Sequence, residues 1–291
     1  MLLLTGATGL VGSALLPRLL AEGTDVRCLV RDPRRLGAQR VRVQIALGDL
    51  TDPPSFRNAL RGVQTVVHLA ASIRDQPHGS IEELTGIATW RMVEAAERQG
   101  VERFVFFSAL GASSHHRTRL LRAKALAEQA VSEAGLASIV FAPSIVYAPG
   151  DPWLTLLERL ALLPLMPVSG NGRAVFQPIW ADDVADCVIA ALRSDSSCTR
   201  YELAGPESLS HDDIVRLVLH SLNRKRALVH VPTPVVSRSL RALERLAGPS
   251  AFATWDEAEL MEVAMTSAQG TNDAERLGVS PQLMGTVLGA G

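Results

Sequence analysis

Short apolar runs alternate with helical patterns along the first two-thirds of the chain. Runs that are apolar at nearly every position are typical of strands buried on both faces. Their alternation with helices predicts a parallel sheet covered on both sides, the doubly wound α/β fold, whose ligand site lies at the carboxyl ends of the strands. The predicted strands are 1–6, 25–32, 41–49, 65–70, 103–110 and 138–144, and the predicted helices are 10–22, 53–61, 80–99 and 117–134.

Composition narrows the class of protein. The 291 residues are 47% hydrophobic, and 29 basic against 30 acidic groups give a formal net charge of −1. The apolar fraction excludes a disordered chain, and the balanced charge removes any global attraction to nucleic acid or an anionic membrane. No apolar run approaches the roughly 20 residues that a membrane-spanning helix needs, so we expect no integral membrane segment. Cys28, Cys187 and Cys198 lie far apart, which favours a reducing, cytoplasmic setting over a disulfide framework or a zinc site.

A glycine-rich turn, TGATGLVG at 5–12, directly follows the first predicted strand and opens the first predicted helix. Its first glycine permits the tight turn, the second lets backbone approach a pyrophosphate, and the third lets the helix pack on the sheet. The helix N-terminus offers free N–H groups and partial positive charge to phosphates. This combination predicts a Rossmann-type dinucleotide site whose contacts from this turn are Gly6, Thr8, Gly9, Leu10, Val11 and Gly12.

The end of the second predicted strand bears on the choice of cofactor. An NAD site usually places a carboxylate there for the ribose hydroxyls, whereas an arginine pairs with the 2′-phosphate of NADP. Arg31, helped by Arg34 or Arg35, therefore favours NADP(H). Asp32 comes one residue late for the carboxylate role and keeps NAD(H) possible. Further contacts are expected at the ends of the third and fourth predicted strands: Asp49, Leu50, Ala70 and Ala71.

The pattern changes after Tyr147, where prolines cluster and the helical segments become shorter. A strand and helix at 176–196 return to the first domain. We therefore predict an NADP(H)-binding domain over 1–147, with 176–196 added to it. The smaller C-terminal lobe, which would bind substrate, consists of 148–175 and 197–291.

These segments resemble, in the correct order, landmarks of the short-chain dehydrogenase/reductase superfamily in its extended and atypical branches. The resemblance spans essentially the whole chain. Among atypical members, it is similar to the nucleotide-binding accessory subunit of respiratory complex I, the NmrA-type regulators and the isoflavone-reductase-like enzymes. The landmarks besides the glycine turn are GDL at 48–50, VVHLAA at 66–71, RFVFFSALGA at 103–112, APSIVYAPGD at 142–151, FQPIWADDVA at 176–185 and LGVSP at 277–281.

The family's usual catalytic unit is a Ser or Thr with a Tyr-x-x-x-Lys pair on one helix. The resemblance implies that Lys124 is this lysine and Ser108 the serine, but Leu120 occupies the place of the tyrosine. Because leucine can neither give nor take a proton, the usual carbonyl–alcohol chemistry has lost its acid. Lys124 then binds ribose hydroxyls, acts as the acid/base itself, or is a surface lysine. Lys225 is the only other lysine, which favours the first two roles, ribose binding first.

Three further positions complete the predicted cofactor site. Pro143, Ser144 and Val146 are expected to place backbone groups against the carboxamide of the nicotinamide. His115 and His116 precede the helix of Lys124 and offer a replacement proton donor if their loop folds inward. No third metal ligand lies near them in sequence, so we expect no metal site.

Three functions are consistent with these residues. The first is an oxidoreductase that transfers hydride to an apolar small molecule, with Lys124 or a bound water assisting the proton. The second is a non-catalytic NADP(H)-binding regulator or accessory protein, which Leu120 favours. The third, an NAD-dependent sugar-nucleotide epimerase or dehydratase, is weakened because that chemistry needs the missing tyrosine. All three predict a small-molecule ligand and no nucleic acid.

Overall fold

Seven parallel strands form the main sheet of the computed structural model, in the order β11-β6-β5-β4-β1-β2-β3. The structure describes residues 1–194, 199–247 and 254–289. Strand β1 lies between β2 and β4, so the order reverses beside it, which is where doubly wound sheets bind their ligands. The predicted fold class is confirmed. The strands are β1 (Leu2–Thr5), β2 (Val26–Val30), β3 (Gln44–Leu47), β4 (Thr65–His68), β5 (Arg103–Phe107), β6 (Ala137–Pro143) and β11 (Thr199–Leu203).

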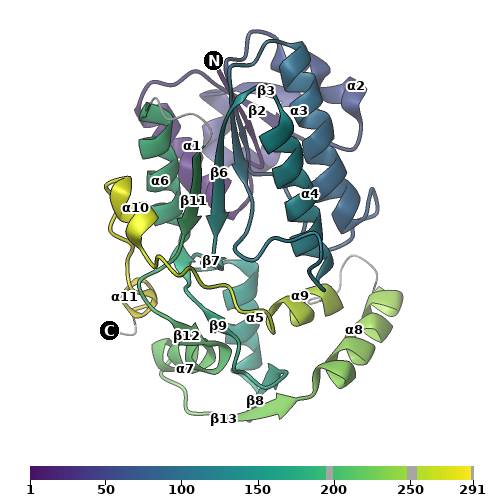
Figure 1. The fold of residues 1–291 in the computed structure, drawn as a ribbon. Coiled ribbons are helices and arrows are strands. Elements are labelled where there is room, and N and C mark those ends of the chain that lie inside the picture. The colour runs from purple at the N-terminus through teal and green to yellow at the C-terminus, as the bar shows by residue number, and fades with distance from the viewer. Residues whose placement is uncertain (195–198, 248–253, 290–291) are drawn as a thin grey trace.

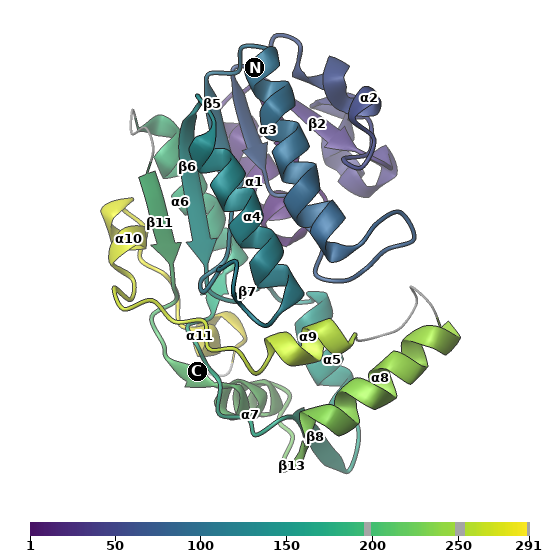
Figure 2. The ribbon, with the colours of Figure 1, turned by 45° about the vertical axis from the view of Figure 1, so that its right-hand side comes forward.

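Helices cover both faces of this sheet (Figure 1). Alternation along β5 divides its side chains between two apolar cores, because successive residues of a strand point to opposite faces. Val105 and Phe107 join the core beneath α1 and α6, whereas Phe104 and Phe106 join the core beneath α3 and α4. Figure 2 shows α3 and α4 running side by side. The helices are α1 (Leu10–Ala21), α3 (Ala88–Arg98), α4 (Arg119–Glu133) and α6 (Ala181–Arg193).

Two predicted helices begin or end in another helical form. The segment predicted as 53–61 is α2 (Pro53–Phe56) followed by the 3₁₀ turn η2 (Arg57–Leu60). The segment predicted as 80–99 opens with the π-helical η3 (Glu82–Ile87) before α3. Gly86 lies in this wider turn, where a Cβ atom would stand 3.1 Å from Cδ2 of Leu126 on α4. The missing side chain therefore lets α4 approach closely.

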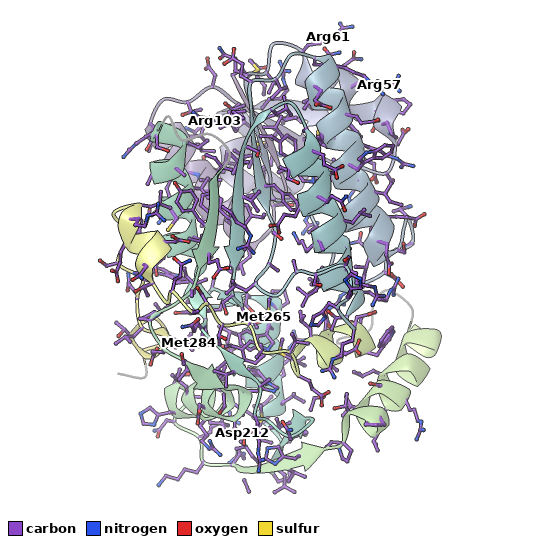
Figure 3. The ribbon with its side chains drawn as sticks, viewed as in Figure 1. Arg57, Arg61, Arg103, Asp212, Met265 and Met284 are labelled. Carbon is purple, nitrogen blue, oxygen red and sulfur yellow. The ribbon has the colours of Figure 1, made fainter. Side chains whose placement is uncertain are left out.

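Most of the remaining elements pack below the carboxyl ends of the main strands (Figure 1). Helix α10 instead lies beside β11, and its Ala274 joins the core beneath α1 and α6. A third apolar core lies among the other elements, and Met265 and Met284, which belong to it, are labelled in Figure 3. Residues 199–203, assigned from sequence to the smaller lobe, instead form β11 at the edge of the main sheet. The elements are β7 (Val146–Tyr147), α5 (Pro152–Leu160), β8 (Leu165–Ser169), β9 (Val175–Phe176), β10 (Ile179–Trp180), β12 (Leu209–Ser210), α7 (His211–Ser221), β13 (Ala227–Val231), α8 (Thr233–Ala247), α9 (Trp255–Leu260), α10 (Asn272–Arg276) and α11 (Met284–Val287).

Two of the three cysteines can be placed. Cys28 and Cys187 are buried free thiols, and burial raises the pKa of each to about 12, so both stay protonated near neutral pH. Cys198 lies outside the described residues. Within the described ranges, no helix combines the length and apolar character that a bilayer crossing requires.

Candidate functional site

The glycine turn joins β1 to α1 in the geometry that a dinucleotide loop needs. Gly6 has φ of 71°, and its carbonyl accepts a hydrogen bond from the N–H of Gly9 at 2.9 Å. A Cβ atom on Gly6 would lie 2.7 Å from the nitrogen of Ala70, and one on Gly12 would lie 2.1 Å from the Gly6 carbonyl. Gly9 caps α1 without a side-chain hydrogen bond, and the first turn carries no acidic residue. The N–H groups of that turn are thus open to an anion.

The other predicted contacts from the turn surround these glycines. Thr8, Leu10 and Val11 are half-buried, and Gly9 is exposed. The turn therefore presents exposed backbone between partly covered side chains. This arrangement fits a diphosphate, because a Cβ at the two closest positions would meet backbone that cannot move aside.

Beyond the end of β2, the side chains of Arg31 and Asp32 make different contacts. Arg31 is exposed, and its Nη1 donates to Oε1 of Gln76, 3.2 Å away on the loop after β4. The carboxylate of Asp32 accepts from the backbone N–H of Arg34 at 3.0 Å and caps the 3₁₀ segment η1 (Pro33–Val41). The acidic side chain is therefore engaged with its own loop. Arg34 and Arg35 are both exposed on that segment.

Asp49 lies just beyond β3, next to the half-buried Leu50. Its Oδ1 accepts 2.9 Å hydrogen bonds from both the backbone N–H and the hydroxyl of Thr51. Partial burial acts to raise the pKa of Asp49, but these bonds and the positive charges of Arg31 and His78 outweigh it and lower the pKa. A charged carboxylate with one oxygen fixed in this way remains a suitable acceptor for an adenine amino group.

At the end of β4, His68 is a buried structural residue. One ring nitrogen is hydrogen-bonded to the hydroxyl of Thr5 at 2.9 Å and the other to that of Thr89 at 3.1 Å. Burial, with a smaller contribution from the charge of Lys124, lowers the pKa of His68 to about 3, so the ring is neutral at physiological pH. The small residues Ala70 and Ala71 follow, half-buried and exposed respectively.

Lys124 is buried at the carboxyl end of β5, so it is not a surface lysine. Its side chain extends from α4, its Nζ donates to the carbonyl of Phe107, and it lies 5.2 Å from the centroid of the Phe106 ring. Burial lowers the pKa of the amine to about 8, and the charge of Glu128 partly opposes that shift. Leu120, one helical turn earlier, is half-buried. The amine is thus poised to exchange a proton close to neutral pH.

Ser108 follows the last residue of β5 and is 3% exposed. Its hydroxyl donates to Oε2 of Glu128 at 2.5 Å, and its N–H donates to the carbonyl of Phe141 at 2.7 Å. Sequence reasoning missed Glu128. Its position four residues after Lys124, which places both on one face of α4, was the signal that could have revealed it.

The two histidines before α4 are bound to their own loop. His115 is exposed, and its Nδ1 is 3.0 Å from the hydroxyl of Ser114. His116 is half-buried, and its Nδ1 accepts from the N–H of Thr118 at 3.1 Å. Burial, ahead of neighbouring arginine charges, lowers the pKa of His116. The described residues contain no cluster of three metal-ligating side chains.

Ser144 connects the main sheet to the C-terminal segment. Its hydroxyl donates to the carbonyl of Met265 at 2.6 Å and accepts from the N–H of Gln177 at 3.1 Å. Its own N–H donates to Leu203, and the carbonyl of Pro143 accepts from Leu110. The hydroxyl and N–H of Ser144 are therefore occupied within the protein, while Val146 is half-buried in β7. The expected contact of Pro143, Ser144 and Val146 with a carboxamide stays a prediction.

Residues 6–195 match a family model described as NAD(P)H-binding. The chain belongs to this NAD(P)H-binding family. Its resemblance to the short-chain dehydrogenase/reductase superfamily is confirmed by the match and by the relatives that share it. The glycine turn at the N-terminal boundary of the match is the element that positions phosphates in such domains.

Two relatives and one solved structure illustrate the family. Subunit 9 of the NADH dehydrogenase [ubiquinone] 1 alpha subcomplex of Arabidopsis thaliana is 29% identical over 79% of the chain. The match spans 60% of that relative's length. Ceramide reductase of Caulobacter vibrioides is 26% identical over 79% of the chain and 73% of its own length. A nucleoside-diphosphate-sugar epimerase from Staphylococcus aureus superposes with a TM-score of 0.79 over 99% of both chains at 21% identity, a likeness of fold alone.

Proposed function

We propose that the protein binds NADP(H) and transfers hydride to or from an apolar small molecule without a tyrosine as acid/base. One observation carries this proposal: Lys124 is only 7% exposed, and its amine donates a hydrogen bond to the carbonyl of Phe107, the last residue of β5. Burying an amine costs free energy, and buried titratable groups with perturbed pKa values concentrate at sites that bind or react. Lys124 therefore marks the nicotinamide end of the site.

Several side chains support NADP(H) over NAD(H). Arg31 extends at the end of β2 with one hydrogen bond to Gln76, which leaves further guanidinium donors for a 2′-phosphate. Asp32, which caps η1 through the Arg34 N–H, comes one residue after the position at which an NAD site usually places its carboxylate. The nicotinamide, when bound, supplies or accepts the hydride.

The proposed roles of the chain's own residues follow from position. Lys124 donates hydrogen bonds to the ribose hydroxyls, and its pKa of about 8 also lets it hold or release a proton near neutral pH. Ser108 lies beside it with its hydroxyl directed to Glu128. The elements below the carboxyl ends of the main strands would supply the substrate-binding surface. A relative named ceramide reductase supports an apolar substrate.

A second candidate is a non-catalytic accessory protein that holds NADP(H) for structure or redox sensing. Leu120 favours it, because the helix that carries Lys124 lacks the usual acid. A relative that is by name a subunit of NADH dehydrogenase supports it as well. An epimerase or dehydratase is less favoured, because its chemistry needs the phenol that Leu120 replaces.

The two candidates separate in one set of assays. NADPH should raise the melting temperature, and a panel of quinones, enones and aldehydes should then oxidise the bound NADPH. Lys124→Ala should abolish turnover while sparing most of the cofactor affinity, whereas Lys225→Ala, at the other lysine, should change neither. Leu120→Tyr recreates the Tyr-x-x-x-Lys spacing and should increase turnover. NADPH that binds but is oxidised by neither wild type nor Leu120→Tyr would favour the accessory role, and no binding of either nucleotide would refute both.

A further inference from the structure

Glu128 lies on α4 one turn after Lys124, and it links Ser108, at the end of β5, to Arg200 on the edge strand β11. Its Oε2 accepts from the hydroxyl of Ser108 at 2.5 Å, and its Oε1 accepts from Nε of Arg200 on β11 at 2.8 Å. Residues four apart on a helix are neighbours on its surface, so the carboxylate lies one turn from the Lys124 side chain. Each carboxylate oxygen therefore has its own donor, one from the end of β5 and one from β11.

Arg200 is itself held in place. Its Nη1 donates to Oε1 of Glu202 at 2.8 Å, and Oε2 of Glu202 accepts from the hydroxyl of Ser267 at 2.6 Å. The chain of contacts runs from Ser108 through Glu128, Arg200 and Glu202 to the C-terminal segment. Moving Glu128 would break its bonds both to Arg200 on β11 and to Ser108 at the end of β5.

The groups facing the Lys124 amine come from three elements. Strand β5 contributes the carbonyl of Phe107 and the ring of Phe106, both uncharged. Strand β4 contributes His68, which is neutral because burial depresses its pKa to about 3. Helix α4 contributes Glu128, the carboxylate whose charge acts on the pKa of the amine against its burial. The ammonium form therefore depends on Glu128 for ionic compensation.

We propose that Glu128 is a positioning residue of this site: its carboxylate, partly neutralised by Arg200, favours the charged form of the Lys124 amine and fixes the direction of the Ser108 hydroxyl. The inference deepens the proposed function, because it concerns the same amine that would serve the nicotinamide ribose. A charged ammonium donates stronger hydrogen bonds to sugar hydroxyls than a neutral amine does. Glu128 thus extends the site one helical turn beyond the residues that the family pattern marks.

The scarcity of lysine makes a direct test possible. Protein labelled with ¹³C at the lysine ε carbon gives signals from Lys124 and the exposed Lys225 only, and each can be titrated in the protein without nucleotide. Glu128→Gln keeps an acceptor for Ser108 but removes the charge. It should lower the titration midpoint of Lys124 by about 0.5–1 pH unit, a 3–10-fold smaller charged-to-neutral ratio at fixed pH. Lys225 should not move, nor should Lys124 in the control Glu133→Gln, an exposed glutamate on the same helix.

A second variant makes the sign decisive. Arg200→Gln removes the cation that partly neutralises the Glu128 carboxylate, so the Lys124 midpoint should rise instead of falling. Opposite shifts in the two variants support the proposal. A midpoint unchanged in both folded variants, or lowered in both, overturns it, and Arg200→Gln decides alone if Glu128→Gln does not fold. NADPH binding is measured separately by thermal shift. If NADPH does not bind but the Lys124 midpoint shifts as expected in the two variants, the result counts against the proposed function and not against the role of Glu128.

Discussion

Replacing Lys124 by methionine should stabilise the protein near neutral pH. The amine is buried, and its pKa falls from 10.5 to about 8. One pKa unit corresponds to 1.36 kcal/mol, so the charged amine destabilises the folded state by about 3 kcal/mol at pH 7. Losing the hydrogen bond to the Phe107 carbonyl costs about 1–2 kcal/mol. Because methionine is of similar length and apolar, we expect a net gain of about 1–2 kcal/mol.

The pH dependence distinguishes this cause from a simple change in packing. Between pH 8 and 10.5 the unfolded chain binds more protons at this lysine than the folded chain does, so wild-type stability rises with pH through that window. The destabilisation is fully present below pH 8 and falls to about 1 kcal/mol at pH 10. The advantage of Lys124→Met should therefore shrink, and then reverse, as the pH rises.

Urea unfolding at pH 7, 8, 9 and 10 measures the difference in the free energy of unfolding between Lys124→Met and wild type. The contributions of all other titrating groups cancel in this difference. Lys225→Met is the matched control, because Lys225 is exposed and should give no pH-dependent difference. A constant difference between the two curves over this range would show that the amine titrates alike in the folded and unfolded states. The argument from burial would then be refuted.

Three further outcomes are expected. Gly12→Ala should cost about 1–3 kcal/mol of stability and remove the thermal shift caused by NADPH, because its Cβ would lie 2.1 Å from a backbone oxygen. Gly285→Ala, whose Cβ meets nothing closer than 3.8 Å, should change neither quantity in the same melting experiment. His68→Gln should reduce the loss of stability on acidification, measured by urea unfolding. In wild type, the imidazole takes up a proton below pH 6.5 in the unfolded chain but not in the folded one, where its pKa is about 3. This difference lowers the stability of wild type by about 2 kcal/mol at pH 5. Arg31→Glu should weaken the affinity for NADPH about tenfold or more in fluorescence titrations, and the affinity for NADH far less. Arg61→Glu, at the end of the sheet remote from the C-terminal lobe in Figure 3, should leave both affinities unchanged. An equal loss of affinity for the two nucleotides would contradict the phosphate assignment.

The parts of the fold that sequence predicts well are those with local causes. The glycine turn needs no long-range information, because its spacing alone specifies a tight bend followed by a helix. The apolar runs predicted strands β1 to β6, and all of these strands except the exposed edge strand β3 are largely buried. Lys124 was singled out from the sequence because the chain has two lysines and one stands at the family position, and the structure shows that it is buried.

The parts that escaped prediction depend on contacts between distant segments. Pairing of β8 with β13 joins residues some sixty positions apart, and neither strand is apolar throughout. Ser144 fits the family pattern, yet its hydroxyl is engaged with the carbonyl of Met265, 121 residues later. Glu128 looks like an ordinary surface residue of an amphipathic helix until β11 places Arg200 against it. Such partners are set by topology, which composition and periodicity do not specify.

The energetics of Lys124 also bear on the choice between an oxidoreductase and an accessory protein. A ribose ligand alone needs a donor, and a neutral hydroxyl or amide would serve at less cost than an amine whose burial destabilises the fold by about 3 kcal/mol at pH 7. An amine with a pKa of about 8 differs from those donors in that it can pass a proton near neutral pH. Because Leu120 removes the other proton carrier from this helix, the surviving amine is the group best placed to do so. Proton exchange at Lys124 is therefore the property that an inert binding protein would not need.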